Sequence, residues 1–522
     1  MDSEKNKNVK RIIADAVIFF GFMLLAVGLI MFLVFNKDVF FSAGVMAVLF
    51  AITMLILPVG YVLTLKKASG GKYALYAAIV LLAAAVAMLI AIVLKSFIID
   101  YVQPLALSTM TIIILIAAGV ITLIGALLEL IFRRHTVSII TCAMLIAVML
   151  TGIIWYNTQG YGKFNDDILD NGQFLFKNGE SGYATFRIPS IIALDHEVLN
   201  EKYGMTLTED VLLASAEGRR NSSHDTGSID LVYKTSEDGG KTWSDLKILL
   251  SYTDQIGKYG NPTPVLDSET GLVNFPYMTG TEADKYDYKT YNARFRVESN
   301  LTLTLNETPQ DISFEQTDTS GGGADGVRQH TLMIGPGKSI QLKTGERKGR
   351  IIVPASSGGY AFVMYSDDNG LTWIKGENAG TGNECEAAEL DDGTLVMVIR
   401  DMTGCSTYHP EQYQRLSYSD DGGETWYEQT VDTTLRSPIC MSSVAVKDGK
   451  LIMSYPDSFH TRVNLTLGVS EDGGDNWITY PVYNGAAGYS CVTVTSDNRV
   501  FVLAEIGKIN YNEILYFAEI KI

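Results

Sequence analysis

The chain has 522 residues with 41 Lys plus Arg and 58 Asp plus Glu, which gives a formal net charge of −17 at pH 7. This length allows two or more domains, and the acidic balance gives no reason to expect a nucleic-acid partner. Five cysteines are too few for a disulfide framework, which excludes the small scaffolds that depend on one.

Residues 1–156 differ from the rest in charge, since they carry a net +5 and leave −22 for residues 157–522. This part contains five apolar stretches near the ~20 residues that a membrane-spanning helix needs. A secretion signal would explain only the first stretch. We therefore expect an α-helical membrane domain of five transmembrane helices over residues 1–156. The stretches are 12–35, 39–65, 73–94, 107–132 and 137–156.

Lys and Arg gather before the first stretch, between the second and third, and between the fourth and fifth. By the positive-inside rule the amino terminus is cytoplasmic, and an odd number of spans places everything after Tyr156 outside. We therefore expect a multi-pass protein of the plasma membrane with an extracellular domain. The polar segment 157–175 is expected to be a linker, and residues 176–522 are expected to form the outer domain.

The outer segment contains four copies of the pattern S-x-D-x-G-x-x-W, which begin at Ser236, Ser366, Ser419 and Ser470. Asp can accept backbone N–H groups across a tight bend, Gly supplies a positive φ, and Trp packs beside the turn. A calcium loop would need acidic or amide residues at alternate positions and a Glu beyond the Gly. No copy supplies that set, so we expect turns and neither a metal nor a cofactor.

Apolar runs of four to eight residues alternate with Gly, Asp and Asn clusters throughout the outer segment, which indicates an all-β domain. Successive copies of the pattern start 130, 53 and 51 residues apart. About fifty residues is the size of a four-stranded propeller blade, and the long first gap leaves room for further blades. The predicted fold class is an all-β six-bladed β-propeller ectodomain preceded by the membrane domain of five transmembrane helices.

Three arginines lie where a surface charge would be unusual. Arg187 interrupts an apolar strand before Pro189, Arg400 ends the strand LVMVIR, and Arg462 follows a strand end. A half-buried Arg needs an anion, and its planar fork suits a carboxylate. A structural ion pair would explain any one of them alone. Three strand-end arginines that converge on a propeller axis favour the carboxylate of a ligand.

The sequence Phe186-Arg187-Ile188-Pro189 precedes the four repeats. With this F-R-I-P motif, the chain resembles the sialidase (neuraminidase) family over about residues 175–522. The resemblance implies that Arg187, Arg400 and Arg462 bind the carboxylate of a sialic acid, and that Glu505 supports the first arginine. It also implies that Arg219 and Asn261 contact other substituents of the sugar.

The resemblance further implies three catalytic residues. Asp225, in the loop Ala216 to Asp225, would protonate the leaving oxygen and then activate water. Tyr489 would attack the anomeric carbon while Glu384 takes its proton. A neutral phenol suits this carbon, since the adjacent carboxylate would repel an anionic nucleophile. Judged without the resemblance, Asp225 is an ordinary turn residue and Tyr489 an ordinary strand residue.

Together these features imply a membrane-anchored exo-α-sialidase that acts on sialylated glycoproteins, glycolipids or oligosaccharides outside the cell. It would retain the anomeric configuration through a tyrosyl-enzyme intermediate. Alternatives stay open: a trans-sialidase, including the intramolecular kind, or a non-catalytic sialic-acid-binding surface lectin. The five-span domain would also fit a transporter or sensor that uses the propeller to capture its ligand.

Overall fold

The computed structural model describes residues 162–253, 256–280, 288–313, 332–402, 412–459, 461–508 and 510–522. These residues form antiparallel β-sheets with a single short helix, α6 (His196–Tyr203), between the first two strands of one sheet. Asp195 caps α6 by accepting the N–H groups of Glu197 and Val198, and Gly204 ends it in the left-handed conformation, as such positions favour. In the described part, most backbone N–H and C=O groups lie in strands, where pairing with a neighbouring strand provides their hydrogen bonds.

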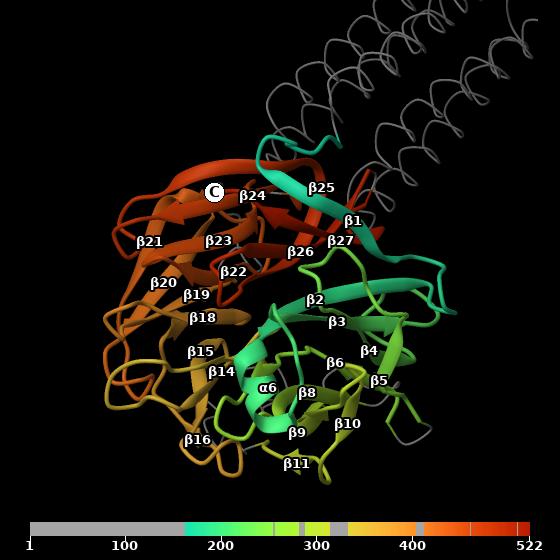
Figure 1. Ribbon diagram of the computed structural model, residues 1–522. Helices are drawn as coiled ribbons and strands as arrows, with labels where there is room; N and C mark the ends of the chain where they lie inside the picture. Colours follow the sequence, from blue (N-terminus) through green and yellow to red (C-terminus); the bar gives the residue numbers. More distant parts are fainter. Residues whose placement is uncertain are drawn as a thin grey trace, which may run out of the picture. The chain divides into compact units, whose positions relative to one another are not determined.

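The described strands form four hydrogen-bonded sheets. Two of these sheets each contain two antiparallel groups, joined by a parallel bridge between β4 and β6 in one and by the long strand β25 in the other. We call the resulting six groups blades one to six in chain order (Figure 1). Blade one contains β2 (Thr185–Leu194), β3 (Val211–Arg219), β4 (Ile229–Ser236) and β5 (Lys247–Leu250). Blade two contains β6 (Lys258–Gly260), β7 (Val265–Leu266), β8 (Val273–Gly280), β9 (Tyr288–Val297), β10 (Leu303–Leu305) and β11 (Gln310–Asp311).

Blades three and four follow the same up-and-down order. Blade three contains β12 (Met333–Ile334), β13 (Ile340–Gln341), β14 (Ile351–Ser357), β15 (Tyr360–Ser366), β16 (Ile374–Lys375) and β17 (Gly380–Thr381). Blade four contains β18 (Cys385–Glu389), β19 (Leu395–Ile399), β20 (Tyr413–Ser419) and β21 (Tyr427–Arg436).

Blades five and six share one long strand. Its first part pairs with β24 in blade five, and its second part pairs with β26 in blade six. Blade five contains β22 (Ser443–Lys447), β23 (Lys450–Pro456), β24 (Val463–Ser470) and the first part of β25 (Ile478–Val494). Blade six contains the second part of β25, β26 (Val500–Gly507), β27 (Ile514–Ile520) and β1 (Leu169–Lys177).

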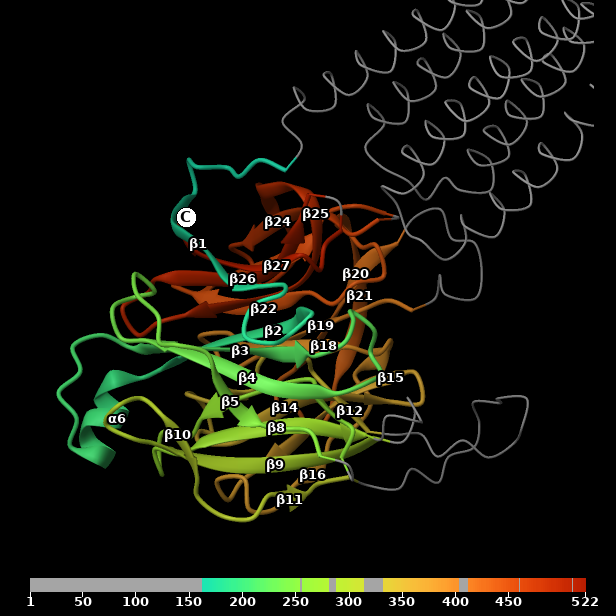
Figure 2. The same cartoon turned by 90° about the vertical axis from the view of Figure 1, so that its right-hand side faces the viewer.

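The blades are arranged in a closed ring. The innermost strands β2, β7, β13, β18, β22 and β25 contact one another in this order, and β25 contacts β2 again. Strand β1 pairs with β27, so a strand from the start of the described part completes the last blade (Figures 1 and 2). This closure protects the sheet edges that an open arrangement would expose. Strand β1 begins inside the segment that the sequence predicted to be a linker. The prediction missed this strand because Asp-Asn-Gly is typical of a turn.

The four sequence repeats form turns between the third and fourth strands of their blades. In the first repeat, the Ser236 hydroxyl donates to Asp238 and accepts the Gly240 N–H, at 2.8 and 2.9 Å. The Asp238 carboxylate also accepts the Thr242 N–H at Oδ1 and the Thr242 hydroxyl at Oδ2, at 2.9 and 2.6 Å. Trp243 donates to the Gly240 carbonyl at 3.1 Å. The predicted turn chemistry is confirmed for this repeat.

The glycine at the fifth position of each repeat lies at a blade-to-blade contact. Gly240 has φ +81°, and a Cβ placed there would lie 2.2 Å from the ring of Phe517 in blade six. The same position, Gly423, would bring a Cβ 2.7 Å from Val363 in blade three. Only glycine combines this φ with such a close approach. The repeats therefore attach each blade that carries one to the blade before it.

The apolar core is divided among the gaps between neighbouring blades. One cluster joins Leu212 of blade one to Phe501 and Phe517 of blade six, and another joins Val363 of blade three to Met397 of blade four. Each such side chain stabilises the fold by about 1.5–3 kcal/mol on full burial. Because each cluster needs two blades, the ring of blades is the folding unit.

The helical part of the predicted fold class needs a correction. Among the described residues, no helix is both long enough and apolar enough to cross a bilayer, and α6 has 8 residues. The backbone hydrogen bonds of the described residues instead come mainly from strand pairing. The five expected spans fall on residues 1–156, which lie outside the described residues. The location in the plasma membrane that was inferred from those spans stays a prediction.

Candidate active site

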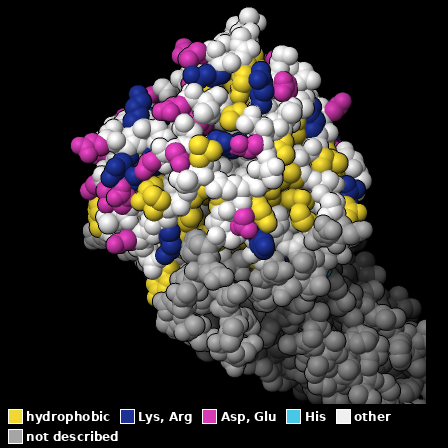
Figure 3. Space-filling model, turned by 90° about the horizontal axis from the view of Figure 1, so that it is seen from below, with side chains coloured by type: hydrophobic (Ala, Val, Ile, Leu, Met, Phe, Trp, Pro, Cys, Tyr) yellow, Lys and Arg dark blue, Asp and Glu magenta, His cyan; other side chains and the backbone are white. Residues whose placement is uncertain are grey.

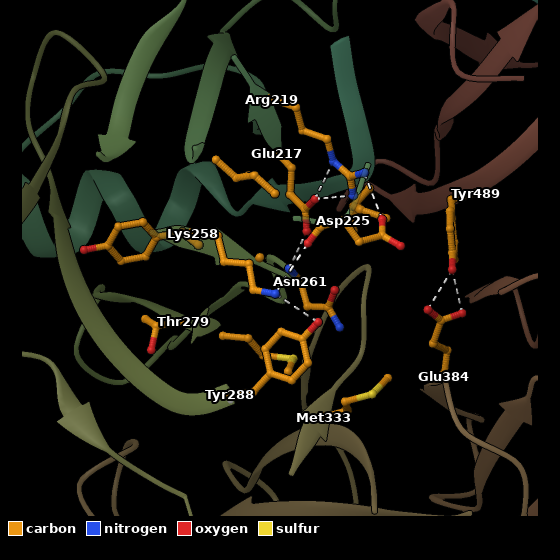
Figure 4. A pocket seen from close by; sticks show the side chains of 15 residues that line it. Glu217, Arg219, Asp225, Lys258, Asn261, Thr279, Tyr288, Met333, Glu384 and Tyr489 are labelled. Carbon is orange, nitrogen blue, oxygen red and sulfur yellow. Dashed lines mark hydrogen bonds and ion pairs between the residues drawn. The ribbon is translucent and has the colours of Figure 1, made fainter. Parts of the chain in front are cut away.

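A cavity of about 170 Å³ opens among strand ends on one side of the blades (Figure 4). Figure 4 shows Tyr489 and Glu384 facing each other on one side, with Glu217, Arg219 and Asp225 grouped on another. The lining residues come from blades one, two, three, four and six, so only the closed ring assembles the cavity. They are Ile188, Glu217, Arg219, Asp225, Ile229, Lys258, Tyr259, Gly260, Asn261, Met278, Thr279, Tyr288, Met333, Glu384 and Tyr489.

Tyr489 and Glu384 form a buried hydrogen-bonded pair. The Tyr489 hydroxyl lies 2.7 and 2.9 Å from the two carboxylate oxygens of Glu384. A guanidinium nitrogen of Arg400 donates to the same hydroxyl at 2.9 Å and forms an ion pair with Glu384. Glu384 directly precedes β18 and Arg400 directly follows β19, so the antiparallel pairing of these strands places the two side by side.

Burial and the adjacent Glu384 carboxylate raise the pKa of Tyr489 above the ordinary value of a phenol, although Arg400 and Arg462 act in the opposite direction. The phenol is therefore protonated at neutral pH. Its oxygen needs a base to become a strong nucleophile, and Glu384 is in hydrogen-bond contact to act as that base.

Arg187 is held by a fully buried acid. Its guanidinium donates to Glu505 at 3.0 and 3.3 Å, and Glu505 also accepts the backbone N–H groups of Ile188 and Tyr489 at 3.0 and 3.2 Å. Burial lowers the pKa of Arg187, but the Glu505 carboxylate and nearby tyrosines raise it by more, so the guanidinium stays charged. Glu505 thus joins the segments that carry Arg187 and Tyr489.

Irregularities in strand pairing set the directions of the Arg187 and Tyr489 side chains. The pairing of β2 with β3 shifts between Arg187 and Ser190, and Ile188 has φ +55°. The pairing of β25 with β26 likewise shifts between Ala487 and Ser490, on either side of Tyr489. Such bulges re-aim side chains, and a β-branched residue at positive φ costs free energy that the surroundings must offset.

The three arginines converge on Tyr489. The guanidinium carbons of Arg187 and Arg462 lie 5.5 and 5.1 Å from the centre of the Tyr489 ring, and Arg400 contacts its hydroxyl. Arg462 donates to the Ile439 carbonyl at 3.2 Å. The Nε atom of Arg400 is buried and has no hydrogen-bond partner among the described residues. Buried guanidinium groups arranged in this way can bind an anion, above all a carboxylate.

Asp225 lies on the loop that follows β3 and reaches two arginines. Its carboxylate lies 2.8 Å from Arg219 and 3.4 Å from Arg187. The side chain is 73% exposed, and its pKa is lowered because the attraction of Arg219 and Arg187 exceeds the opposing effect of desolvation. From this exposed loop, Asp225 lines the cavity.

Arg219 and Asn261 are both held by Glu217. The Glu217 carboxylate accepts from Arg219 at 3.0 and 2.6 Å and from the backbone N–H of Asn261 at 3.1 Å. The Asn261 amide donates to the Ile334 carbonyl at 2.9 Å, and Asn261 has φ +50°. Asparagine tolerates this conformation better than most residues.

All nine residues proposed from the sequence therefore lie in the cavity or in direct contact with residues that line it.

Comparison with known proteins assigns the chain to a family. Residues 210–502 match the family described as BNR repeat-like domain, which is more than half of the chain. The chain belongs to this family. A sialidase of Micromonospora viridifaciens is 27% identical over 367 residues, which cover 64% of this chain and 52% of that protein. A sialidase of Bacteroides fragilis is 26% identical over 364 residues, with 63% of this chain and 61% of that protein covered. The chain thus spans between half and two thirds of these relatives.

The BNR repeat-like chain also resembles solved structures. A Hadza microbial sialidase, Hz136, superposes with a TM-score of 0.53 at 23% sequence identity, over 67% of this chain and 68% of that one. A Trypanosoma rangeli sialidase in complex with 2,3-difluorosialic acid gives a TM-score of 0.51 at 19% identity, over 68% and 59%. At these identities the similarity shows a shared fold.

Sequence reasoning missed several residues of the cavity. Glu217 precedes Arg219 by two positions in β3, and this spacing places both side chains on one face of a strand, so a period-two pattern would have found it. Lys258 is buried, with its ammonium 3.4 Å from the Asp225 carbonyl and 3.3 Å from the Tyr288 hydroxyl. No sequence motif marks Lys258 or Tyr288, since only the pairing of β8 with β6 on one side and with β9 on the other brings them to the cavity.

One group of side chains in the described part has the composition of a metal site, Asp195, His196 and Asp210. Its atoms already have partners, because Asp210 accepts from His196 at 2.8 Å and from the Ser496 N–H and hydroxyl at 2.6 and 2.9 Å. The group belongs to the cap of α6 and lies outside the cavity lining. We assign it a structural role.

Proposed function

We propose that this chain is an exo-α-sialidase, a glycoside hydrolase that removes terminal sialic acid from glycoproteins, glycolipids or oligosaccharides. The observation that carries the proposal is the Tyr489 hydroxyl, 2.7 Å from the Glu384 carboxylate, with Arg187, Arg400 and Arg462 grouped around the Tyr489 side chain. The family and the relatives named sialidases support the same substrate class.

The arginines would bind the substrate carboxylate. Arg187 and Arg400 each have a carboxylate partner in the structure, Glu505 and Glu384, and they still present further N–H groups. The net −22 of residues 157–522 opposes an anionic sugar only weakly, because charges beyond about 8–10 Å are screened at physiological salt. Acidic and basic side chains are also interspersed on the face shown in Figure 3. Contacts with the three guanidinium groups therefore decide the affinity.

The first chemical step would form a tyrosyl-enzyme intermediate. Glu384 takes the hydroxyl proton of Tyr489 as the phenol oxygen forms a bond to the anomeric carbon. The bond from that carbon to the leaving oxygen breaks, and Asp225 donates a proton to this oxygen. A neutral nucleophile avoids repulsion by the substrate carboxylate.

The second step would reverse the protonation. Asp225, now a carboxylate, takes a proton from water while the water oxygen forms a bond to the anomeric carbon. The bond between this carbon and Tyr489 breaks, and Glu384 returns its proton to the phenol oxygen. Two inversions at the same carbon give retention of configuration.

Asp225 would have to change partners during this cycle. Its carboxylate now lies 3.4 Å from Arg187, where it occupies one of the guanidinium groups that the substrate carboxylate would contact. Binding of the substrate would displace Asp225 from Arg187 and remove part of the attraction that lowers its pKa. A higher pKa is what a general acid needs at neutral pH.

The test is release of sialic acid by the full chain from a fluorogenic sialoside, with the product followed by NMR. We expect the α-anomer of the free sugar as first product, and strong loss of release in Tyr489→Phe and in Asp225→Ala. Binding without release would favour a lectin. A 2,7-anhydro product would favour the intramolecular transfer suggested by a relative named anhydrosialidase from Macrobdella decora, which is 24% identical.

A further inference from the structure

Tyr511 lies on the turn between β26 and β27 and stacks on two of the three arginines. The guanidinium carbons of Arg187 and Arg462 lie 5.5 and 5.0 Å from the centre of its ring. The same two groups lie 5.5 and 5.1 Å from the ring of Tyr489. Each guanidinium thus contacts both rings at distances typical of cation–π interactions.

Charge balance makes this arrangement informative. Glu505 neutralises Arg187, whereas none of the described carboxylates lies within ion-pair distance of Arg462, whose hydrogen bond goes to the Ile439 carbonyl. Two neighbouring cations repel each other, and both guanidinium groups are at least partly removed from water. The electron-rich faces of the two rings offset part of this cost.

The surrounding backbone is built to hold the Tyr511 ring. A Cβ on Gly488 would lie 2.6 Å from this ring and 2.4 Å from Glu505, so the position before Tyr489 accommodates no larger residue without displacing one of them. The turn itself is fixed by Glu513, which accepts the N–H groups of Lys508 and Asn510 at 3.1 and 2.8 Å. The ring position follows from fixed neighbours on both sides.

We propose that Tyr511 is a positioning residue for anion binding, whose aromatic face holds Arg187 and Arg462 in the orientation that receives the carboxylate of an acidic sugar. The proposal rests on the proposed function for the identity of the ligand. It assigns Tyr511 no part in bond making or breaking, because its contacts are with the two guanidinium groups through the ring face.

The consequence is a selective loss of carboxylate recognition when the ring is removed. Replacing Tyr511 by Leu keeps an apolar side chain but removes two cation–π contacts, and we expect affinity for an acidic ligand to fall about tenfold. Tyr511→Phe keeps the aromatic face and should bind within about twofold of wild type. For a ligand without the negative charge, the affinities of the two variants should be nearly the same.

The experiment measures binding of the full chain by calorimetry, with the 2,3-unsaturated derivative of N-acetylneuraminic acid as probe and its methyl ester as the uncharged counterpart. We expect Tyr511→Leu to bind the acid about tenfold more weakly than wild type and to bind the ester with unchanged affinity. We expect Tyr511→Phe to bind both ligands as wild type does. In turnover of the fluorogenic sialoside, the Leu variant should raise KM about tenfold while kcat changes less than about threefold.

Tyr365→Leu is the matched control, because Tyr365 of blade three also stacks on an arginine, Arg350, at 4.0 Å. It should leave both dissociation constants unchanged. Thermal denaturation of each variant shows whether it is folded. Wild-type affinity for the acid in Tyr511→Leu, or equal losses for acid and ester, would overturn the proposal, as would a wild type that does not bind the acid. A wild type that binds the acid in a Tyr511-dependent way but releases no sialic acid would refute the proposed activity alone.

Discussion

The repeat turns and the cavity use polar side chains in opposite ways. In a repeat turn, partners lie two to four residues apart, as between Ser236 and Gly240. In the cavity, partners lie far apart in sequence, as between Arg187 and Glu505, which are 318 residues apart. Local pairing forms with the turn itself, whereas the distant pairs exist only once the ring has closed. The first kind serves the scaffold, and the second leaves charged groups available to a ligand.

The largest effect should come from the cavity and should leave the fold intact. Tyr489→Phe removes the hydroxyl that Glu384 contacts, and we expect kcat for sialoside hydrolysis to fall at least about 10³-fold. Thermal stability should change little, because the ring and its stacking on Arg187 remain. A variant that keeps more than a tenth of wild-type kcat would remove Tyr489 from the proposed mechanism.

The next largest effect should be on stability at the same site. Glu505→Leu removes the buried carboxylate partner of Arg187 and leaves only the exposed Asp225 at 3.4 Å. Breaking a buried pair in this way costs about 3–5 kcal/mol of the free energy of unfolding. Urea denaturation measures this cost. The exposed pair Lys450 with Glu471 is the control, and Glu471→Leu should change the free energy of unfolding far less, because solvent screens an exposed pair. Similar losses in both variants would contradict the contrast between the buried and the exposed pair.

A smaller effect should come from the repeat turns. Gly240→Ala places a Cβ against Phe517 at φ +81°, for which we expect about 2–4 kcal/mol of destabilisation from overpacking and backbone strain together. Gly182 has nearly the same φ, +82°, with nothing within 4 Å of an added Cβ. Gly182→Ala should therefore cost only about 1–2 kcal/mol. Denaturation curves that coincide would show that the contact with blade six is unimportant.

The smallest effect concerns the pair of a partly exposed His196 and a buried Asp210, outside both regions. Asp210, which lies 2.8 Å from the His196 ring, raises the pKa of His196 through a hydrogen bond, against a smaller effect of desolvation. A raised pKa in the folded state adds stability that is fully present below about pH 6.5 and lost as the pH rises through the raised pKa. His196→Gln should therefore cost at most about 1 kcal/mol at pH 5.5 and less at pH 9. Thermal unfolding at both pH values measures this, and a cost that grows with pH would contradict it.

Predictions from local sequence succeeded where the physical cause was local. The repeats were expected to be turns, and their hydrogen bonds at Asp238 are those of a turn. Strand β1 was missed, because Asp170, Asn171 and Gly172 read as a loop and only pairing with β27 makes them part of a blade. The helical membrane part of the fold class rested on apolar runs in residues 1–156, which lie outside the described residues.

Predictions of the site depended on motifs whose members are far apart. The sequence placed Arg187, Arg400 and Arg462 at strand ends, and the structure brings all three to Tyr489. Tyr511 carries no motif, and neither does Lys258. Their places follow from the order in which the strands pair, which a single sequence does not reveal.

By itself, the sequence determined the repeat turns, the alternation of short strands and the candidate residues at their ends, because each of these depends on neighbours a few positions away. Only the tertiary structure decided which charges meet. Ring closure through β1 and β27, the bulges at Ile188 and Tyr489, and the stacking of Tyr511 on two arginines all need contacts between distant segments. The free energy that holds buried guanidinium groups beside a phenol comes from those contacts, and no local pattern encodes it.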